Sequence, residues 1–244
     1  MERIDKVLSY SLGASRKEIK LFLSKGRVKL NGKVIKKSDL KINPLSDELS
    51  FDGRIIPYKK NTYLMLNKPK GFVSATEDKS QKTVLELVPR ELFREGLFPA
   101  GRLDKETTGF VLLTDDGDLA HEILSPKKHV TKEYIATVDG LIDQSIINSF
   151  KNKIELKNGD KCLEARLIPI SCSRELSVGR VIIKQGMYHQ VRRMFASVGL
   201  KVLELKRVRI GSLPLDESLA EGEIRELSPE ELELLKLPSE EYDF

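Results

Sequence analysis

Hydrophobic and polar positions near the start of the chain predict a small module of two helices and a hairpin. Residues 3–8 begin a short helix that Gly13 ends, because glycine readily adopts the backbone conformation found after a helix C-terminus. Ser15 stands three residues before Glu18, which is the spacing of a capping box, and begins a second helix. Alternating residues on both sides of Asn31-Gly32 then predict a β-hairpin.

Further along the chain, predicted strands and helices alternate in an irregular order. Apolar segments predict strands over residues 63–71, 109–114, 132–138, 163–170, 178–184 and 201–210. Helices are predicted over 118–124, 143–151 and about 188–199, and a capping box at Thr83 begins another that Pro89 ends. The spacing lacks the regular units of a doubly wound parallel sheet, so we expect an α+β fold with a mixed or antiparallel sheet.

A short polar stretch separates the two regions. Residues 57–62 (PYKKNT) lie between segments with different patterns, which is typical of a linker. We therefore expect a small domain over 1–58, a linker over 59–62 and a larger domain over 63–244 with an acidic end.

The net charge of +5 conceals an uneven distribution. Residues 1–60 carry 15 Lys+Arg against 7 Asp+Glu, residues 61–212 carry 25 against 19, and residues 213–244 carry 2 against 11. The basic residues of the second predicted helix and the turn after it are Arg16, Lys17, Lys20, Lys25 and Arg27. Such a basic surface indicates a polyanionic partner, RNA or DNA, whereas the acidic end is typical of a solvated helix.

Other features exclude several classes of protein. No apolar run approaches the roughly 20 residues that span a bilayer, and the N-terminus lacks the apolar core of a signal peptide, so we expect a cytoplasmic protein without a membrane partner. Cys162 and Cys172 belong to no CxxC motif and are expected to be reduced thiols. The absence of P-loop, GxGxxG, GxSxG and HExxH motifs argues against a nucleotide cofactor, an α/β-hydrolase and a zinc protease.

The stretch AGRLDKETTGFVLLTDDG, residues 100–117, places charged residues directly before an apolar strand. A guanidinium such as that of Arg102 would help to keep the Asp104 carboxylate ionised, and an ionised carboxylate can act as a nucleophile. The alternative is an ordinary acid that bonds to amides in a turn. Asp115 and Asp116 follow the strand without the spacing of an EF-hand, and predict a strand-to-helix turn.

Two further segments carry candidate chemistry. The segment GMYHQVRRMF places Arg192 and Arg193 near a helix start, where a guanidinium binds a carboxylate or a phosphate, or faces solvent. Tyr134 stands on a predicted strand, where it either packs or, in a nucleic-acid pocket, stacks on an extruded base. The three histidines are scattered, and we expect structural roles for them rather than a metal triad.

Both regions resemble known families. RIDKVL…SRKEIKLFLSKGRVKLNGKVI, within residues 1 to about 58, resembles the S4 RNA-binding domain. MLNKPKG, AGRLDKETTGFVLLTDDG, HVTKEY and GMYHQVRRMFASVG…VLELKRVRIG occur in the order found in the RsuA/RluB/RluE/RluF family of pseudouridine synthases. The resemblance covers nearly the whole chain and is strongest to the branch that acts on small-subunit ribosomal RNA.

The resemblance implies a catalytic domain with a mixed, largely antiparallel sheet and an active-site cleft across it. It implies that Asp104 attacks the ribose C1′, or assists departure of the base through a glycal. Arg192 would pair with Asp104, and Tyr134 would stack on the target base. The other expected substrate contacts are Arg102, Leu205 and Arg193. The reaction is an isomerisation, which needs neither a metal nor a cofactor.

The implied partner is ribosomal RNA, either naked or within an assembling small-subunit particle, and we expect a monomer. Two other hypotheses remain at this point. One is a non-catalytic S4-type RNA-binding protein of ribosome assembly. The other is a magnesium-dependent nuclease that uses Asp104, Asp115 and Asp116.

Overall fold

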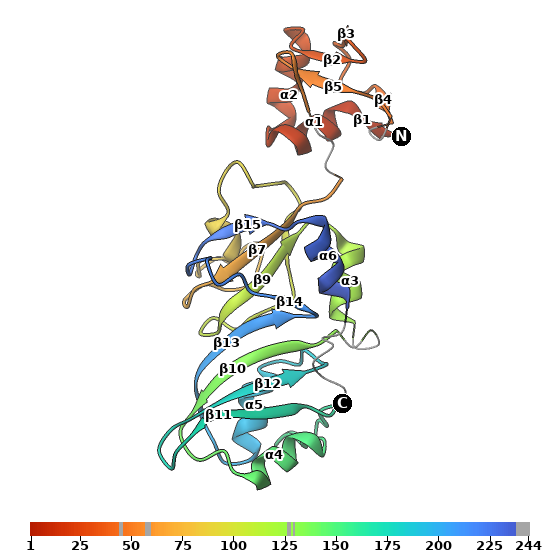
Figure 1. The fold of residues 1–244 in the computed structure, drawn as a ribbon. Coiled ribbons are helices and arrows are strands. Elements are labelled where there is room, and N and C mark those ends of the chain that lie inside the picture. Colours follow the sequence, from red (N-terminus) through yellow and green to blue (C-terminus); the bar gives the residue numbers. More distant parts are fainter. Residues whose placement is uncertain (44–45, 57–59, 126–127, 129, 238–244) are drawn as a thin grey trace. The chain divides into compact units, whose positions relative to one another are not determined.

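The computed structural model describes residues 1–43, 46–56, 60–125, 128 and 130–237, and Figure 1 shows its ribbon. Its contacts divide the chain into two compact units. The first is Met1–Thr62 with Val88–Leu97, and the second is Tyr63–Leu87 with Phe98–Phe244. The expected linker over 59–62 begins at Lys59, which lies outside the described residues, as does the acidic end over 238–244.

The first unit contains the two predicted helices and the predicted hairpin. Its elements are α1 (Ile4–Leu12), α2 (Arg16–Ser24), β1 (Glu2–Arg3), β2 (Val28–Leu30), β3 (Lys33–Val34), β4 (Lys41–Ile42), β5 (Leu49–Phe51) and β6 (Arg54–Ile55). Ser15 and Glu18 form the predicted capping box of α2, and Gly13 ends α1 in the left-handed conformation. The strands form an antiparallel sheet in the order β3-β2-β5-β6, while β1 pairs with β4.

The core of the first unit is small because only one face of each helix is apolar. Its buried residues are Ile4, Val7, Leu8, Ile19, Leu23, Val28, Ile42 and Leu49. Residues 88–97 add to this unit through Arg94, which is buried and donates from Nε to the carbonyl oxygen of Tyr10 at 3.3 Å. Its guanidinium carbon lies 4.6 Å from the centroid of the Tyr10 ring. A segment from further along the sequence thus becomes part of the first unit.

The second unit is built on a nine-stranded sheet. Its strands are β7 (Tyr63–Lys68), β8 (Phe98–Ala100), β9 (Thr108–Thr114), β10 (Lys132–Val138), β11 (Arg166–Cys172), β12 (Ser177–Ile183), β13 (Val202–Ile210), β14 (Leu213–Pro214) and β15 (Ile224–Glu226). The order is β11-β12-β10-β13-β9-β7-β15, with β14 on β13 and β8 on β9. Among the described strands of this sheet, β13 and β9 are the parallel pair and the others are antiparallel. The predicted α+β fold with a mixed, largely antiparallel sheet is confirmed.

The parallel pair β13 and β9 divides this sheet into two halves, one with β10 to β13 and the other with β7 to β9, β14 being paired with β13 and β15 with β7. Helices accompany both halves. They are α3 (Gly117–Leu124), α4 (Gln144–Lys151), α5 (Gln190–Ser197) and α6 (Pro229–Lys236), with a short 3-10 helix, η1 (Val84–Leu87). Figure 1 shows α3 next to α6, and both helices contribute to one core cluster with β7 and β9. α4 and α5 meet through Phe150 and Phe195, whose ring centroids are 4.9 Å apart. None of the described helices is long and apolar enough to cross a bilayer.

The parallel contact between β9 and β13 requires a glycine. Gly109 has φ +98°, and a Cβ built on it would lie 2.2 Å from the carbonyl oxygen of Arg207 on β13. The Arg207 side chain crosses the same contact, because its Nε donates to the carbonyl oxygen of Phe110 at 2.7 Å. The two halves of the sheet therefore meet at this close approach of two backbones, near the start of β9.

Candidate active site

Asp104 lies in the loop directly before β9, and this loop is fixed on both sides of the residue. Leu103 is buried, and Ser74 Oγ both accepts from its N–H and donates to its carbonyl oxygen, at 3.0 Å each. On the other side, the N–H of Thr107 donates to the carbonyl oxygen of Asp104 at 3.0 Å. The carboxylate remains partly exposed while its backbone is held.

Lys68, the last residue of β7, holds this loop through hydrogen bonds to its backbone. Its fully buried Nζ donates to the carbonyl oxygens of Pro69, Lys105 and Thr107 at 3.0, 3.1 and 2.8 Å. Burial lowers the pKa of Lys68 to about 8. Sequence reasoning missed this residue, because a lysine at the end of a strand is usually solvated.

Three side chains approach the carboxylate of Asp104. Nε2 of His189 lies 3.3 Å from Oδ1, and Nε of Arg192 lies 3.7 Å from Oδ2. Thr107 Oγ1 donates to Oδ2 at 3.5 Å. Nη1 of Arg192 also donates to the carbonyl oxygen of Val202 at 3.1 Å, which fixes the guanidinium next to the acid. His189 was expected to have only a structural role, and its contact with Asp104 was not foreseen.

Tyr134 and Leu205 lie on the same face of the sheet. Tyr134 is nearly buried on β10, two residues before Ala136, which pairs with Leu205 on β13. Tyr134 itself pairs with Arg207 on β13. If Gly101 carried a Cβ, that atom would lie 3.9 Å from Nη1 of Arg207, so the Arg207 side chain reaches the backbone of Gly101. The face that carries Tyr134 and Leu205 therefore borders the start of the Asp104 loop.

Two other predicted residues are not among the ion-pair partners of Asp104 in the described structure. Arg102 is exposed and forms no ion pair with Asp104, so the guanidinium next to this acid is that of Arg192. Arg193 contacts Asn158 and pairs with Asp160 at 3.2 Å, while its Nη1 donates to the carbonyl oxygen of Tyr188 at 3.3 Å.

Asp116, which follows β9, has a structural role. Asp116 caps α3 by accepting from the N–H groups of Asp118 and Leu119 at 3.1 Å each, and it accepts from Tyr63 Oη at 2.7 Å. The predicted strand-to-helix turn is confirmed. Asp104 precedes and Asp115 follows a seven-residue strand, which spans about 23 Å. Among the described residues, no three His, Cys, Asp or Glu side chains are grouped as a metal site would require.

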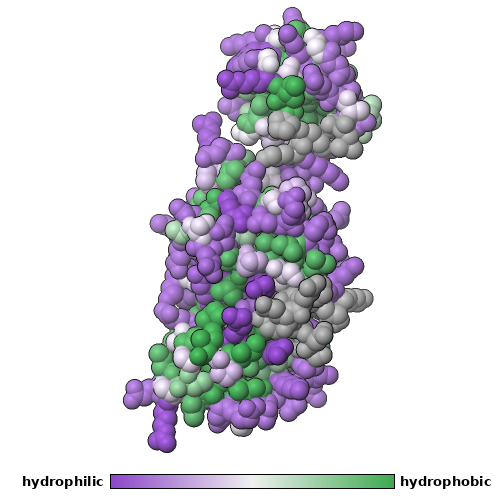
Figure 2. Space-filling view, viewed as in Figure 1, coloured by the Kyte–Doolittle hydropathy of each residue, from purple (hydrophilic) through white to green (hydrophobic). Residues whose placement is uncertain are grey.

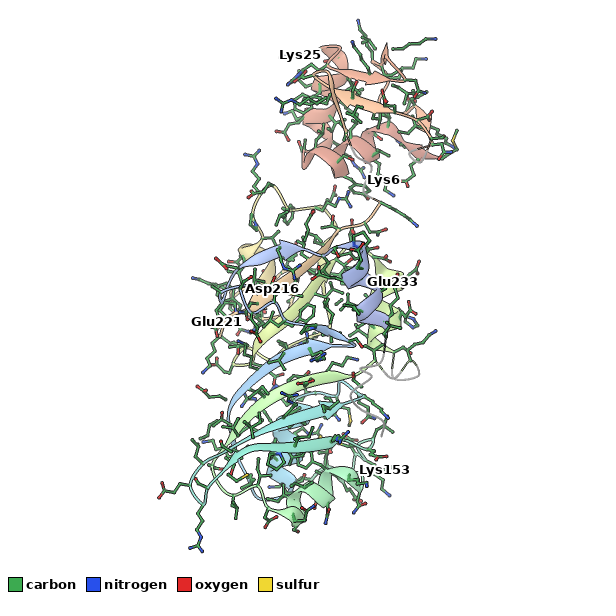
Figure 3. The ribbon with its side chains drawn as sticks, in the orientation of Figure 1. Lys6, Lys25, Lys153, Asp216, Glu221 and Glu233 are labelled. Atoms are coloured by element: carbon green, nitrogen blue, oxygen red, sulfur yellow. The ribbon has the colours of Figure 1, made fainter. Side chains whose placement is uncertain are left out.

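The predicted RNA-binding residues of the first unit fall into two groups. Arg16, Lys17, Lys20 and Lys25 are exposed on α2 and at its end, as Figure 3 shows for Lys25. The visible face of this unit is largely hydrophilic in Figure 2. Arg27, by contrast, is engaged within the unit: it pairs with Asp52, and its guanidinium carbon lies 4.8 and 4.4 Å from the ring centroids of Phe22 and Phe51.

The sequence profiles of two families match this chain. The RNA pseudouridylate synthase profile matches residues 62–197, which contain Asp104, Tyr134 and Arg192, and the S4 domain profile matches residues 2–49. The chain belongs to the RNA pseudouridylate synthase family. The resemblance inferred from the motifs is confirmed, and this pseudouridine synthase is an isomerase rather than a non-catalytic RNA-binding protein.

Individual relatives of this pseudouridine synthase match over nearly its whole length. The "Uncharacterized RNA pseudouridine synthase YtzG" of Bacillus subtilis (strain 168) is 42% identical over 97% of this chain and 99% of its own. The "Ribosomal small subunit pseudouridine synthase A" of Yersinia pestis is 38% identical over 97% of this chain and 99% of its own. A crystal structure of a pseudouridylate synthase, 35% identical, matches with a TM-score of 0.67 over 96% of this chain and 100% of its own.

Proposed function

We propose that this pseudouridine synthase converts a specific uridine of small-subunit ribosomal RNA to pseudouridine, with Asp104 as its nucleophile. The observation that carries the proposal is the partly exposed Asp104 carboxylate, held on a fixed loop with Arg192 at 3.7 Å. The substrate class is supported by relatives in Yersinia pestis and Escherichia coli (strain K12), both with the name "Ribosomal small subunit pseudouridine synthase A". Such a substrate would place the enzyme in the cytoplasm.

In the proposed reaction, the Asp104 carboxylate either attacks C1′ of the ribose or assists departure of the base through a glycal. The N1–C1′ bond breaks, the uracil turns, and a C5–C1′ bond forms. If the carboxylate has attacked C1′, its ester bond to C1′ breaks as C5 bonds; if a glycal has formed, C2′ regains the proton that it lost. C5 then loses its proton and N1 gains one, so that substrate and product are isomers. The proposed chemistry requires a carboxylate that remains ionised and correctly aimed. Arg192 supplies the adjacent positive charge, and Val202 fixes the orientation of its guanidinium.

Tyr134 and Leu205 are the proposed walls of the base pocket. A uridine must leave its stack before its C1′ can reach an enzyme carboxylate, and this costs a few kcal/mol. The ring of Tyr134 offers a stacking surface for the extruded uracil, and Leu205 adds an apolar contact on the same face. Tyr134 is also the group that we propose to assist removal of the C5 proton.

Further contacts with the RNA are assigned by exposure. We assign phosphate contacts to Arg102 in the second unit and to Arg16, Lys17, Lys20 and Lys25 in the first, because these cations are exposed. Arg193 is assigned to substrate binding through the Tyr188 backbone that it holds.

Asp104, Tyr134, Arg192 and Leu205 belong to one chain, so a monomer is sufficient for the reaction.

Tritium release tests this proposal. Full-length wild type and Asp104→Asn are incubated, in EDTA, with small-subunit rRNA labelled at uridine C5. Naked RNA and partly assembled small-subunit particles are compared as substrates. We expect release by wild type and none by Asp104→Asn, which should still bind the RNA because it keeps the size and shape of the side chain. Release by Asp104→Asn would contradict the role of Asp104, and no release by wild type from either substrate would contradict the rRNA assignment.

A further inference from the structure

Tyr188 presents an aromatic ring to solvent close to the proposed nucleophile. Its residue is 74% exposed, more than any other described phenylalanine or tyrosine. The ring stacks on that of His189, with centroids 3.9 Å apart and an angle of 17° between the planes. His189 in turn lies 3.3 Å from Oδ1 of Asp104. An exposed aromatic stack therefore begins at the carboxylate and continues outward.

The backbone beneath this stack is held in an uncommon conformation. His189 has φ 48° and ψ 34°, in the left-handed region that residues other than glycine rarely adopt. Such a conformation persists only where the surrounding structure imposes it, and it is enriched at functional sites. His189 is also the N-cap of α5, and in this conformation its ring lies next to Asp104.

Two side chains of α5 hold the backbone just before His189. Nη1 of Arg193 donates to the carbonyl oxygen of Tyr188 at 3.3 Å, and Arg193 is itself held by Asp160. Buried Gln190 accepts from the N–H of Met187 at 3.0 Å through its Oε1. Residues 187–190 are thus ordered before any substrate binds, and this lowers the entropic cost of binding.

We propose that Tyr188, supported by His189, is a stacking subsite for the base of a nucleotide next to the target uridine. This proposal rests on the function proposed above. When the uridine leaves its stack, the neighbouring base loses a stacking partner, and an aromatic ring next to the reacting sugar replaces it. Tyr188 does not serve the target base, whose pocket is formed by Tyr134 and Leu205. Stacking uses the π-face of any base, so this subsite contributes affinity without reading sequence.

Four substitutions in the full-length enzyme separate stacking from other roles of Tyr188. Tyr188→Phe keeps the ring and removes the hydroxyl, whereas Tyr188→Leu keeps apolar bulk and removes the ring. Tyr188→Ala removes both, and Ile170→Ala is the control because Ile170 is another exposed apolar residue of the second unit. Steady-state tritium release from small-subunit rRNA gives kcat and KM for each variant.

We expect Tyr188→Leu and Tyr188→Ala to raise KM about tenfold, within the range for loss of one base stack, and to leave kcat within about twofold. Tyr188→Phe and Ile170→Ala should match wild type. A tenfold rise in Tyr188→Phe would overturn the stacking assignment in favour of a hydrogen bond from the hydroxyl. Wild-type KM in Tyr188→Leu, measured with an active wild type, would overturn the subsite and leave the proposed function intact.

Fluorescence provides a second measurement that a merely structural role would not affect. Once the product is mapped, short RNAs carry 2-aminopurine immediately 5′ or 3′ of the target uridine. Asp104→Asn binds them without turnover, and at one of the two positions stacking on Tyr188 should quench the probe. The double variant Asp104→Asn/Tyr188→Leu should lose that quenching at saturating RNA. Equal quenching in both proteins at both positions would overturn the subsite. An inactive wild type on rRNA would instead overturn the proposed function, and with it the subsite.

Discussion

The guanidinium of Arg192 connects the carboxylate of Asp104 to the backbone of Val202. Nε lies 3.7 Å from Oδ2 of the acid, and Nη1 donates to the Val202 carbonyl oxygen at 3.1 Å. The acid precedes β9, whereas Val202 begins β13. The position of the positive charge next to the proposed nucleophile is therefore set by a strand on the other side of the parallel contact.

Replacement of Arg192 by lysine should damage catalysis more than binding. A lysine keeps the charge, but its single ammonium cannot reproduce the fixed fork of the guanidinium. We expect Arg192→Lys to lower kcat about 100-fold, the scale of a misplaced catalytic group, with RNA affinity changed less than about threefold. Single-turnover tritium release and filter binding measure the two effects. Arg174→Lys, in the exposed turn between β11 and β12, is the control. Equal losses in affinity and rate would contradict this assignment.

Gly109→Ala should disrupt the contact between the two halves of the sheet. The added Cβ would meet the Arg207 carbonyl oxygen at 2.2 Å, at a backbone φ of +98° that alanine adopts only with strain. We expect the free energy of unfolding to fall by at least about 3 kcal/mol. Gly117→Ala is the matched control, because a Cβ there meets nothing within 4 Å and the residue begins α3. Urea denaturation checks both variants, and a stable Gly109→Ala would show that the two strands can separate at little cost.

The exposed lysines of the first unit should contribute affinity that depends on salt. We expect the triple variant Lys17→Ala/Lys20→Ala/Lys25→Ala to weaken RNA binding and to reduce the slope of log K against log salt by about 2. Binding at several KCl concentrations measures the slope. Arg27→Ala is the comparison: its guanidinium packs over Phe22 and Phe51 and pairs with Asp52, so it should lower thermal stability. An unchanged slope in the triple variant would exclude these lysines from phosphate contact.

Stability should rise with pH through the titration of Lys132. Its Nζ is buried and donates to the carbonyl oxygens of Ile123 and Val130 at 2.9 and 2.8 Å. Burial lowers its pKa to about 8 in the folded protein, whereas in the unfolded chain it is about 10.4. Between these values the unfolded chain binds more protons, so the free energy of unfolding increases with pH by up to about 1.4 kcal/mol per unit.

Lys132→Met isolates this contribution because it removes the titrating amine. Urea denaturation at about pH 7.5 and about pH 9.5 gives the change in unfolding free energy for wild type and for the variant. The increase should be larger in wild type. Lys68, which also has a pKa lowered to about 8 by burial, remains in both proteins and cancels in the comparison. The same increase in both proteins would mean that Lys132 does not titrate in this range.

Local patterns predicted the elements whose burial alternates along the sequence. The strand expected over 132–138 is β10, residue for residue, because its two faces differ in burial. The helix after residue 188 was visible because Val191, Met194 and Phe195 form one buried face. The segment expected to form a helix between Thr83 and Pro89 is the four-residue 3-10 helix η1, with Glu86 accepting from Thr83 N–H as the capping spacing predicted.

The sequence did not reveal features that depend on contacts between residues far apart in the chain. β15 joins the sheet by pairing with β7, which lies far earlier in the chain, and Arg94 packs on Tyr10 across 84 positions. His189, which contacts Asp104, has a left-handed backbone, and although histidine is enriched among the non-glycine residues that adopt it, the conformation is too uncommon for the sequence alone to place it there. The motifs singled out Asp104, Tyr134 and Arg192, but only the fold reveals Lys68 and Tyr188 near them.

The parallel contact between β9 and β13 also has a kinetic consequence. Asp104 comes from the β7–β9 half, whereas Tyr134, Arg192 and Leu205 come from the segment between β10 and β13. Each half is held by antiparallel neighbours, and the contact between Gly109 and Arg207 brings together residues nearly 100 positions apart. Pairings of such long range form slowly. During refolding, helix and strand content should therefore recover before enzymatic activity, because the long-range step that joins β9 to β13 is also the step that assembles the active site.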